Sequence, residues 1–249
     1  MKTAQDFMLE IPVLKYNDGI TKARQILRDD RFREVYVTGA RKTLAGYIDI
    51  TDALRVMATK SNVTIEGFVK DPACVDPGDP IEHVANVMRK FHTDSAAVID
   101  PERHILGGVL LSDLFPVIIS RNELTGRVYD RMSRTVVTAG PADTIQKISM
   151  KIMESGFSAF PVVKKGRLAG VISRRDLISS RSVRSALATH AHKTIGEIMT
   201  KDVITIAPGE QIREAAELMV RHDVSRLPVT DGEVLVGIID RHDVLAGLV

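Results

Sequence analysis

The sequence predicts an α/β protein made of four copies of one small unit, each with the element order strand, helix, strand, strand, helix. Three observations lead to this fold class: a short motif recurs four times, an amphipathic helical pattern precedes each copy, and paired apolar runs flank turn residues. Self-similarity at a regular spacing is the signature of repeated supersecondary units. A sheet this small has an exposed apolar face, so the units are expected to pack in pairs.

The recurring motif is a glycine followed six positions later by an aspartate. It reads GVISRRD at 170–176, and its counterparts are GYIDITD at 46–52, GGVLLSD at 107–113 and GIIDRHD at 237–243. The four aspartates lie 61, 63 and 67 residues apart. The apolar middle of the motif predicts the end of a buried strand, and its polar end predicts the first turn of a helix.

The elements ahead of each motif follow the same order in all four copies. Each copy begins with a short strand, predicted in PVLKY (12–16), ACVDP (73–77), TVVTAGP (135–141) and VITIAP (203–208). A helix follows, with its core face at the i, i+4 and i+7 spacing. These triplets are Ile20, Arg24, Leu27; Ile81, Ala85, Met88; Ile145, Ser149, Ile152; and Ile212, Ala216, Met219.

A second strand then precedes the motif, predicted in EVYVTG (34–39), SAAVID (95–100), SAFPVV (158–163) and SRLPVT (225–230). Turn residues such as KKGR (164–167) and DGE (231–233) separate this strand from the motif and indicate a hairpin. The apolar positions of the second half give a predicted core. It comprises Ile145, Ile152, Val162, Val171, Ile172, Ile212, Met219, Val229, Ile238 and Ile239.

Composition limits the function classes. With 44% hydrophobic and 27% charged residues the chain is typical of soluble globular proteins, and the formal charge of +2 makes nucleic acid an unexpected partner. The lone Cys74 fits a reducing compartment, and neither a signal peptide nor a membrane-length apolar run is found, so a cytoplasmic location is expected. Motifs for a catalytic triad, a P-loop or a dinucleotide fingerprint are not found either, and we expect no enzyme activity.

The order of elements, the "hPVV" strand and the "G-h-h-[ST]-x-x-D" junction resemble CBS domains. The resemblance covers about 6–249 and places repeats at 6–60, 67–124, 131–186 and 198–249. It implies two modules, 1–124 and 125–249, that form a disc, as in the gamma subunit of AMP-activated protein kinase, which the four-repeat arrangement resembles. Such modules bind adenosine-containing ligands in two clefts. The resemblance therefore implies a regulatory sensor of AMP, ADP or ATP without a cofactor, acting on an unidentified protein target as a monomer or homodimer.

The third repeat carries the most complete set of the family's ligand-binding residues. Carried over by position, the set is Thr138, Ser158, Ala159, Ser173 and Asp176. Asp176 would accept hydrogen bonds from a ribose diol, while Ser173 and the helix N-terminus would meet a phosphate. A serine three residues ahead of an acid is also a capping box, which needs no ligand. Both interpretations stay open, and they are compatible.

The fourth repeat keeps Thr205, Ser225 and Asp243 but has Asp240 at the position of Ser173. A second carboxylate repels phosphate and favours an uncharged or cationic adenosyl ligand, so S-adenosylmethionine or a related metabolite is the alternative ligand. Arg226, at a position where the kinase subunit has a basic residue, is the predicted phosphate contact toward the third repeat. A solvated surface arginine is the competing interpretation.

The first two repeats depart further from the family. Asp49 stands at the Ser173 position of the first repeat, and Leu110 stands there in the second, so Asp113 is predicted only to stabilise its helix. A scaffold with vestigial clefts is therefore a third possibility. His190 and His192, in the basic linker 181–193, have no cysteine or acid nearby, and no metal site is expected.

Overall fold

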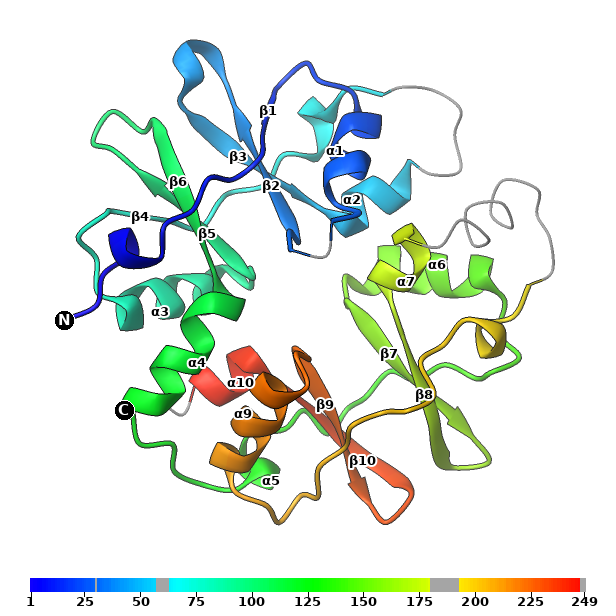
Figure 1. Ribbon diagram of the computed structural model, residues 1–249. Helices are drawn as coiled ribbons and strands as arrows, with labels where there is room; N and C mark the ends of the chain where they lie inside the picture. The colour runs from blue at the N-terminus through cyan, green and yellow to red at the C-terminus, as the bar shows by residue number, and fades with distance from the viewer. Residues whose placement is uncertain (30, 57–62, 180–192, 247–249) are drawn as a thin grey trace. The chain divides into compact units, whose positions relative to one another are not determined.

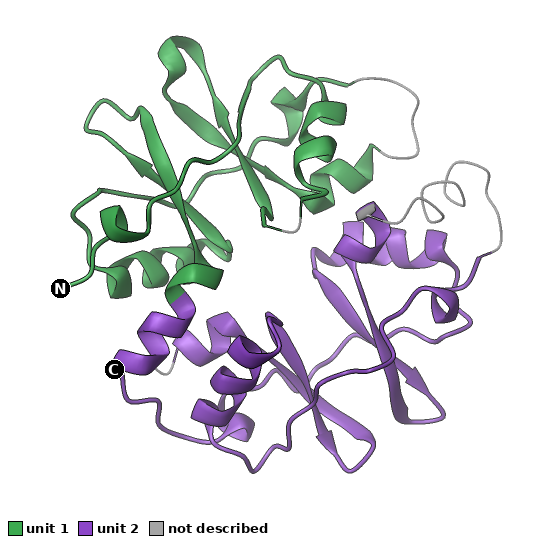
Figure 2. Ribbon diagram, in the orientation of Figure 1, with its two compact units in different colours: residues 1–114 green, residues 115–249 purple. Residues whose placement is uncertain are grey.

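The computed structural model describes the chain except residues 30, 57–62, 180–192 and 247–249 (Figure 1). The chain divides into two compact units, residues 1–114 and 115–249 (Figure 2). Each unit contains two repeats with the predicted helices and hairpins in the predicted order. The mixed α/β fold class is therefore confirmed.

The first unit holds two three-stranded sheets, with orders β1-β2-β3 and β4-β5-β6. In each sheet the first pair of strands is parallel and the hairpin is antiparallel. The elements of repeat 1 are β1 (Val13–Lys15), α1 (Ile20–Ile26), β2 (Glu34–Thr38), β3 (Leu44–Asp49) and α2 (Ile50–Arg55). Those of repeat 2 are β4 (Cys74–Val75), α3 (Ile81–Phe91), β5 (Ser95–Ile99), β6 (Ile105–Leu110) and α4 (Leu111–Arg121).

The second unit joins the hairpins of its two repeats into one four-stranded sheet, with the order β7-β8-β10-β9. A short α5 (Val128–Arg131) precedes repeat 3, which contains α6 (Ile145–Ser155), β7 (Ala159–Lys164), β8 (Arg167–Ser173) and α7 (Arg174–Ser179). Repeat 4 contains α9 (Ile212–Arg221), β9 (Arg226–Asp231), β10 (Val234–Asp240) and α10 (Arg241–Leu245).

The unit boundary falls inside α4, ahead of the predicted module boundary after residue 124. The last turns of this helix are fastened to repeat 4. The Arg213 guanidinium donates to the carbonyl oxygens of Ile119 (3.3 Å) and Asn122 (3.0 Å). The buried Arg241 guanidinium lies 5.4 Å from the ring centroid of Phe115. These contacts explain why the C-terminal part of α4 belongs to the second unit.

The predicted first strands of repeats 3 and 4 are wrong in extent. Each is reduced to one bridge, Ala139 with Val162 and Ile206 with Val229. In repeat 2 the ladder is longer because the amide of Ala97 donates to the carbonyl of Ala73 (2.9 Å). Pro161 and Pro228 stand at the corresponding hairpin positions and have no amide hydrogen, so the parallel ladder stops there.

The second strand of every hairpin is crossed by a residue from the other repeat of the same unit. Two backbone hydrogen bonds of 2.9–3.0 Å join each pair. We call Leu9, Lys70, Ser133 and Thr200 the crossing residues. They pair with Gly108 of β6, Tyr47 of β3, Ile238 of β10 and Val171 of β8, in that order. This exchange of segments holds the two repeats of a unit together.

The motif glycine is required by this crossing. A Cβ atom on Gly170 would lie 2.7 Å from the Thr200 carbonyl oxygen and 2.8 Å from Met199 Sδ. On Gly237 it would lie 2.6 Å from Met132 Sδ and 3.1 Å from the Ser133 carbonyl oxygen. The glycine therefore leaves room for a backbone that crosses the strand closely.

Gly170→Ala is expected to lower the free energy of unfolding by about 1–3 kcal/mol, because the new methyl group overlaps a backbone oxygen that has little freedom to move. Urea unfolding measures the change. Gly209→Ala is the matched control in the same unit, since its Cβ would meet only the end of the Arg127 side chain at 3.9 Å. Equal stability of the two variants would contradict the role assigned to the crossing.

Eight of the ten predicted core positions are buried, and Val171 and Ile238 are not. Those two are half-buried, while the next residues, Ile172 and Ile239, are fully enclosed. Successive side chains of a strand point to opposite faces, so two adjacent residues rarely share one core. The predicted junction is confirmed, because β8 ends at Ser173 and α7 begins at Arg174.

Candidate functional site

The junction of repeat 3 is a formed capping box. The Ser173 amide and the Ser173 hydroxyl both donate to Asp176 Oδ2, each at 2.7 Å. The Asp176 amide donates back to Ser173 Oγ at 3.2 Å. Both bonds to the carboxylate end on Oδ2, so the cap and a contact through Oδ1 are compatible. The Ser173 hydroxyl donates its proton to Asp176, so it would have to rotate before it could donate to a phosphate. The predicted phosphate contact of Ser173 stays a prediction.

The other predicted residues of repeat 3 lie at varying distances from the cap. Ala159 pairs directly with Ser173 across the hairpin, and the Ser158 carbonyl accepts from the Arg174 amide (2.9 Å). Thr138 precedes the bridge residue Ala139, which pairs with Val162, so Thr138 lies beside β7 about two residues along the strand from Ala159. The structure thus brings Ser158, Ala159, Ser173 and Asp176 together, with Thr138 on the neighbouring segment.

Lys151 was not predicted from the sequence to lie near the candidate site. It is half-buried on α6, and its ammonium donates to the Thr138 carbonyl oxygen (2.7 Å) and lies 5.9 Å from the ring centroid of Phe160. It lies outside the apolar face of α6 (Ile145, Ser149, Ile152), so the helical pattern gave no reason to place it near Thr138. It adds a positive charge beside the predicted ligand residues.

The junction of repeat 4 is a capping box between two carboxylates. Asp240 Oδ1 accepts from the amides of His242 (2.9 Å) and Asp243 (3.0 Å), and the Asp240 amide donates to Asp243 Oδ2 (2.9 Å). Burial, followed by the charge of Asp240, raises the pKa of Asp243 to about 7, while Arg226 opposes the shift. This carboxyl group therefore keeps its proton to a higher pH than an ordinary aspartate does.

Arg226 and Ser225 lie at this same junction. Arg226 pairs with Asp240 across the hairpin, as Ala159 pairs with Ser173 in repeat 3, and the Ser225 carbonyl accepts from the Arg241 amide (3.1 Å). Thr205 precedes the bridge residue Ile206. The positions of Thr205, Ser225 and Asp243 thus match those of Thr138, Ser158 and Asp176. The contact of Arg226 with a phosphate at repeat 3 stays a prediction.

Asp243→Asn is expected to raise the free energy of unfolding at pH 8 by on the order of 1–2 kcal/mol, because the amide keeps the cap acceptor and removes the repulsion with Asp240. A carboxyl whose folded-state pKa is raised binds more protons in the folded state. Stability of the parent protein therefore falls as pH rises from about 4 to 7. Chemical unfolding across this range measures the effect, and an unchanged slope in the variant would contradict the assignment.

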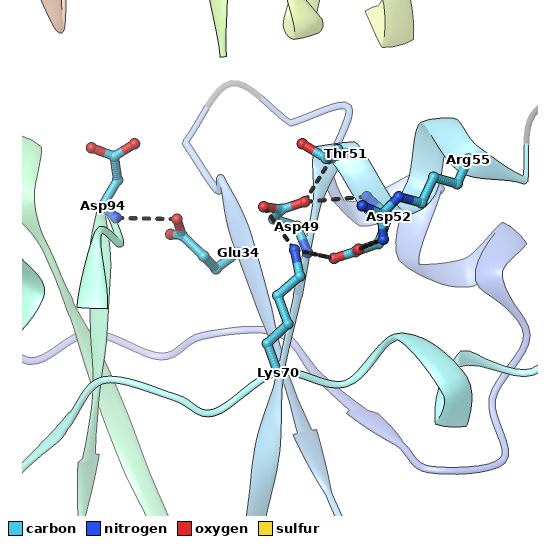
Figure 3. A network of polar contacts seen from close by, with 7 residues as sticks. All are labelled: Glu34, Asp49, Thr51, Asp52, Arg55, Lys70 and Asp94. Atoms are coloured by element: carbon cyan, nitrogen blue, oxygen red, sulfur yellow. Dashed lines mark hydrogen bonds and ion pairs between the residues drawn. The ribbon is translucent and has the colours of Figure 1, made fainter. Parts of the chain in front are cut away.

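The junction of repeat 1 contains a partly buried ionic network around the fully buried Asp52 (Figure 3). Asp49 Oδ1 accepts from the amides of Thr51 (2.7 Å) and Asp52 (3.2 Å), and the Asp49 amide donates to Asp52 Oδ2 (3.0 Å). The Lys70 ammonium reaches Asp49 Oδ2 at 3.2 Å and Asp52 Oδ2 at 2.8 Å. Burial and the Asp49 charge raise the pKa of Asp52, and the ammonium of Lys70 opposes this shift.

Charged and hydroxyl side chains also fill the hairpin starts of the first unit. Glu34 is buried and accepts from the Asp94 amide (3.1 Å) and the Ser95 hydroxyl (2.9 Å), which also contacts the Tyr36 hydroxyl (2.9 Å). Burial raises the pKa of Tyr36 well above its ordinary value. Arg33 pairs with Asp94 at 3.5 Å. The positions that correspond to the small Ser158 and Ala159 are thus taken by large or charged residues in repeat 1.

The junction of repeat 2 has no polar residue at the Ser173 position, where Leu110 is buried. Asp113 is exposed in the first turn of α4 and accepts a 3.3 Å bond from the neighbouring Ser112 hydroxyl. An acid in the first turn of a helix interacts favourably with the helix dipole. These features support the prediction that Asp113 stabilises its helix.

One group of potential metal ligands occurs in the part of the chain that the structure describes. Asp100, Glu102 and His104 have ligand atoms within 4.8 Å of one another at the tip of the β5–β6 hairpin. Asp100 accepts from the His104 amide (2.7 Å) and contacts His104 Nδ1 (3.0 Å), which accounts for both residues as stabilisers of the turn. The predictions for His190 and His192 lie outside the described residues. In the described ranges we find no helix with the length and apolar character needed to span a membrane.

The CBS-domain family model matches residues 65–120, 126–182 and 195–249, which is more than half of the chain. This protein belongs to the CBS-domain family. The matches correspond to repeats 2, 3 and 4, and the segment before residue 65 has the same element order in the structure. The predicted boundaries at 6–60 and in the other repeats stay predictions.

Comparisons with known proteins agree with this assignment. The chain is 29% identical over 174 residues to the uncharacterized protein MJ1225 of Methanocaldococcus jannaschii, an alignment covering 66% of this chain and 62% of the relative. The crystal structure of MJ1225, titled as a proposed archaeal homolog of g-AMPK, superposes with a TM-score of 0.84 at 21% identity and covers 98% of this chain and 99% of that one. An uncharacterized conserved protein of Pyrococcus horikoshii superposes with a TM-score of 0.68 at 23% identity, over the full length of both chains. These structures share the fold.

Proposed function

We propose that this CBS-domain protein is a non-enzymatic regulator that binds an adenine nucleotide, AMP, ADP or ATP, at the junction of repeat 3. One observation carries the proposal: of the four junctions, all described, only that of repeat 3 has a hydroxyl residue, Ser173, at the cap position, where the others have Asp49, Leu110 and Asp240, and it also has small residues on the adjacent strand. Ribose hydroxyls would donate to Asp176 Oδ1, an ionised acceptor. The description of MJ1225 as a proposed archaeal homolog of g-AMPK agrees with such a role.

The charges around this junction suit a phosphate. Arg174 and Arg175 follow Ser173 directly, and Lys151 lies beside Thr138. Arg226 would supply a further cation from repeat 4. It would then lose its favourable charge interaction with the carboxyl group of Asp243. Ligand binding would regulate a separate protein by favouring one arrangement of the paired repeats, since only a difference in affinity between two states shifts their equilibrium.

An adenosyl metabolite such as S-adenosylmethionine is the second candidate, and the acid pair Asp240 and Asp243 favours it. A sulfonium or ammonium group placed near these carboxylates would gain attraction where a phosphate would be repelled. A thermal-shift series with AMP, ADP, ATP, adenosine and S-adenosylmethionine, together with analysis of ligands released from the denatured protein, separates the candidates. Stabilisation by none of them and no released adenosine compound would indicate a ligand-free scaffold and contradict the proposal.

Arg226→Ala is expected to weaken AMP and ATP binding at least fivefold and to leave adenosine binding within about twofold, because a charge-assisted bond to phosphate is worth about 1.5–3 kcal/mol. Isothermal titration calorimetry measures the three ligands. Arg221→Ala, which removes an exposed arginine from α9 of the same repeat, is the control. Equal losses for AMP and adenosine would show that Arg226 acts on the fold and not on the phosphate.

A further inference from the structure

Lys70 enters the junction of repeat 1 from outside that repeat. It is the crossing residue that pairs with Tyr47 of β3, and its side chain continues past the Tyr47 ring (5.7 Å to the centroid) to the two carboxylates of the cap. Figure 3 shows its ammonium between Asp49 and Asp52. The Lys70 side chain is 35% exposed, whereas that of Asp52 is fully buried. The backbone crossing thus fixes where this ammonium lies.

Asp52 corresponds to Asp176, the residue proposed to accept the ribose hydroxyls. Its Oδ2 atom accepts from the Asp49 amide (3.0 Å) and lies 2.8 Å from the Lys70 ammonium, and its Oδ1 atom lies 3.5 Å from Arg55 Nη1. Oδ2 is thus already paired with donors of the chain, while Oδ1 is buried without a hydrogen bond and, among the described residues, lies within ion-pair distance of Arg55 only. A ribose diol would have to displace one of these charges, and the buried carboxylate would lose more than a neutral hydroxyl returns.

The crossing residues differ in the other junctions. Thr200 crosses at repeat 3 and Ser133 at repeat 4, and both are exposed, short and neutral. Leu9, at repeat 2, is apolar. The acid pair of repeat 4 repeats the arrangement of Asp49 and Asp52 without a lysine at the crossing position. The same backbone position therefore carries a cation at one junction, short hydroxyl side chains at two and an apolar side chain at one.

We propose that the crossing residue determines what each junction can hold, and that Lys70 is a built-in occupant that closes the junction of repeat 1 to external ligands. This inference rests on the proposed function only for the equivalence of Asp52 with the ribose acceptor. External ligands are then restricted to the second unit, where Ser133 and Thr200 leave the acids of the cap accessible. Lys70 is thus a residue that sets specificity by occupying a site, and it does not contact the ligand.

Chemical rescue tests the occupancy. Lys70→Ala is expected to lower the melting temperature by about 5–10 °C, because the two carboxylates lose their shared cation. Millimolar n-propylammonium chloride should recover part of this loss, and tetramethylammonium chloride at the same concentration should not, because it has no N–H donors. Lys22→Ala, which breaks the exposed pair with Asp18 (3.0 Å), is the control and should show little loss and no difference between the salts.

The result that overturns the occupancy is an equal response of Lys70→Ala to both salts. Calorimetry with AMP supplies the second readout, and the variant is expected to keep every binding equivalent of the parent, each with a Kd within about twofold. A lost binding equivalent or a tenfold weaker Kd would make Lys70 a ligand contact and refute the proposal. If AMP and adenosine bind neither protein, the proposed function fails, while the rescue by n-propylammonium still decides the role of Lys70.

Discussion

Asp176→Asn is expected to weaken AMP binding at least tenfold. Asparagine keeps one carbonyl acceptor for the cap but loses the charge, and its amide presents donors to a diol that is itself donating. Hydrogen bonds to a charged acceptor are worth about 1.5–3 kcal/mol, which corresponds to a factor of ten or more in Kd. Isothermal titration calorimetry of AMP against both proteins measures the change.

The capping interpretation predicts a different outcome for the same variant. A cap that loses its charge costs roughly 0.5–1 kcal/mol of stability and leaves ligand affinity unchanged. Asp113→Asn is the control, because Asp113 occupies the equivalent first-turn position in repeat 2 but is exposed and has Leu110 in place of the cap serine. Unaltered AMP affinity in Asp176→Asn would leave only the capping role.

Lys70→Met is expected to lower the free energy of unfolding by about 2–3 kcal/mol at pH 8. Methionine has a similar length but removes the cation shared by Asp49 and the fully buried Asp52. Breaking a buried pair costs up to about 3–5 kcal/mol, and the partial exposure of Lys70 reduces this figure. The measurement is guanidinium unfolding of the parent and the variant.

The loss should be smaller at pH 5 than at pH 8. The pKa of Asp52 is already raised by burial and by Asp49, and it rises further without the lysine. Protonation at low pH then relieves the repulsion in the folded state, so stability of the variant falls as pH rises. Adding Asp52→Asn to Lys70→Met should recover most of the loss. A double variant as unstable as the sum of the single variants would contradict the network.

Local spacing in the sequence was sufficient to predict the repeats. The six-residue interval from Gly170 to Asp176 determines both the end of β8 and the start of α7, because a strand side chain and a capping acid each have a fixed local geometry. The same holds for α9, which begins at Ile212 and whose buried residues Ile212, Ala216 and Met219 recur at the helical spacing. The segments that the family model matches contain three of the four motifs, at 107–113, 170–176 and 237–243.

Contacts between repeats could not be predicted in this way. Lys70 reaches Asp52 only because the chain crosses β3 at this point, and such a crossing produces no periodic pattern in the sequence. The one local sign of it is Gly46, because a Cβ atom at that position would clash with the Lys70 carbonyl oxygen. The first strands of the second unit are short because Pro161 and Pro228 have no amide hydrogen for the parallel ladder. Both prolines are evident in the sequence, but the sequence does not show which segment would pair with them. The sequence thus predicted the type of each element better than it predicted which segments pair with each other.

A thermodynamic cycle tests most directly whether Asp176 binds a ribose. AMP and 2′-deoxy-AMP are titrated calorimetrically into the parent protein and into Asp176→Asn, and the four affinities give the coupling between the carboxylate and the hydroxyl. The proposed site predicts that 2′-deoxy-AMP binds the parent about tenfold more weakly than AMP does, and that the two ligands differ by no more than about twofold in the variant. The same ratio of affinities in both proteins would show that Asp176 does not accept from the ribose, and would contradict the nucleotide site at repeat 3.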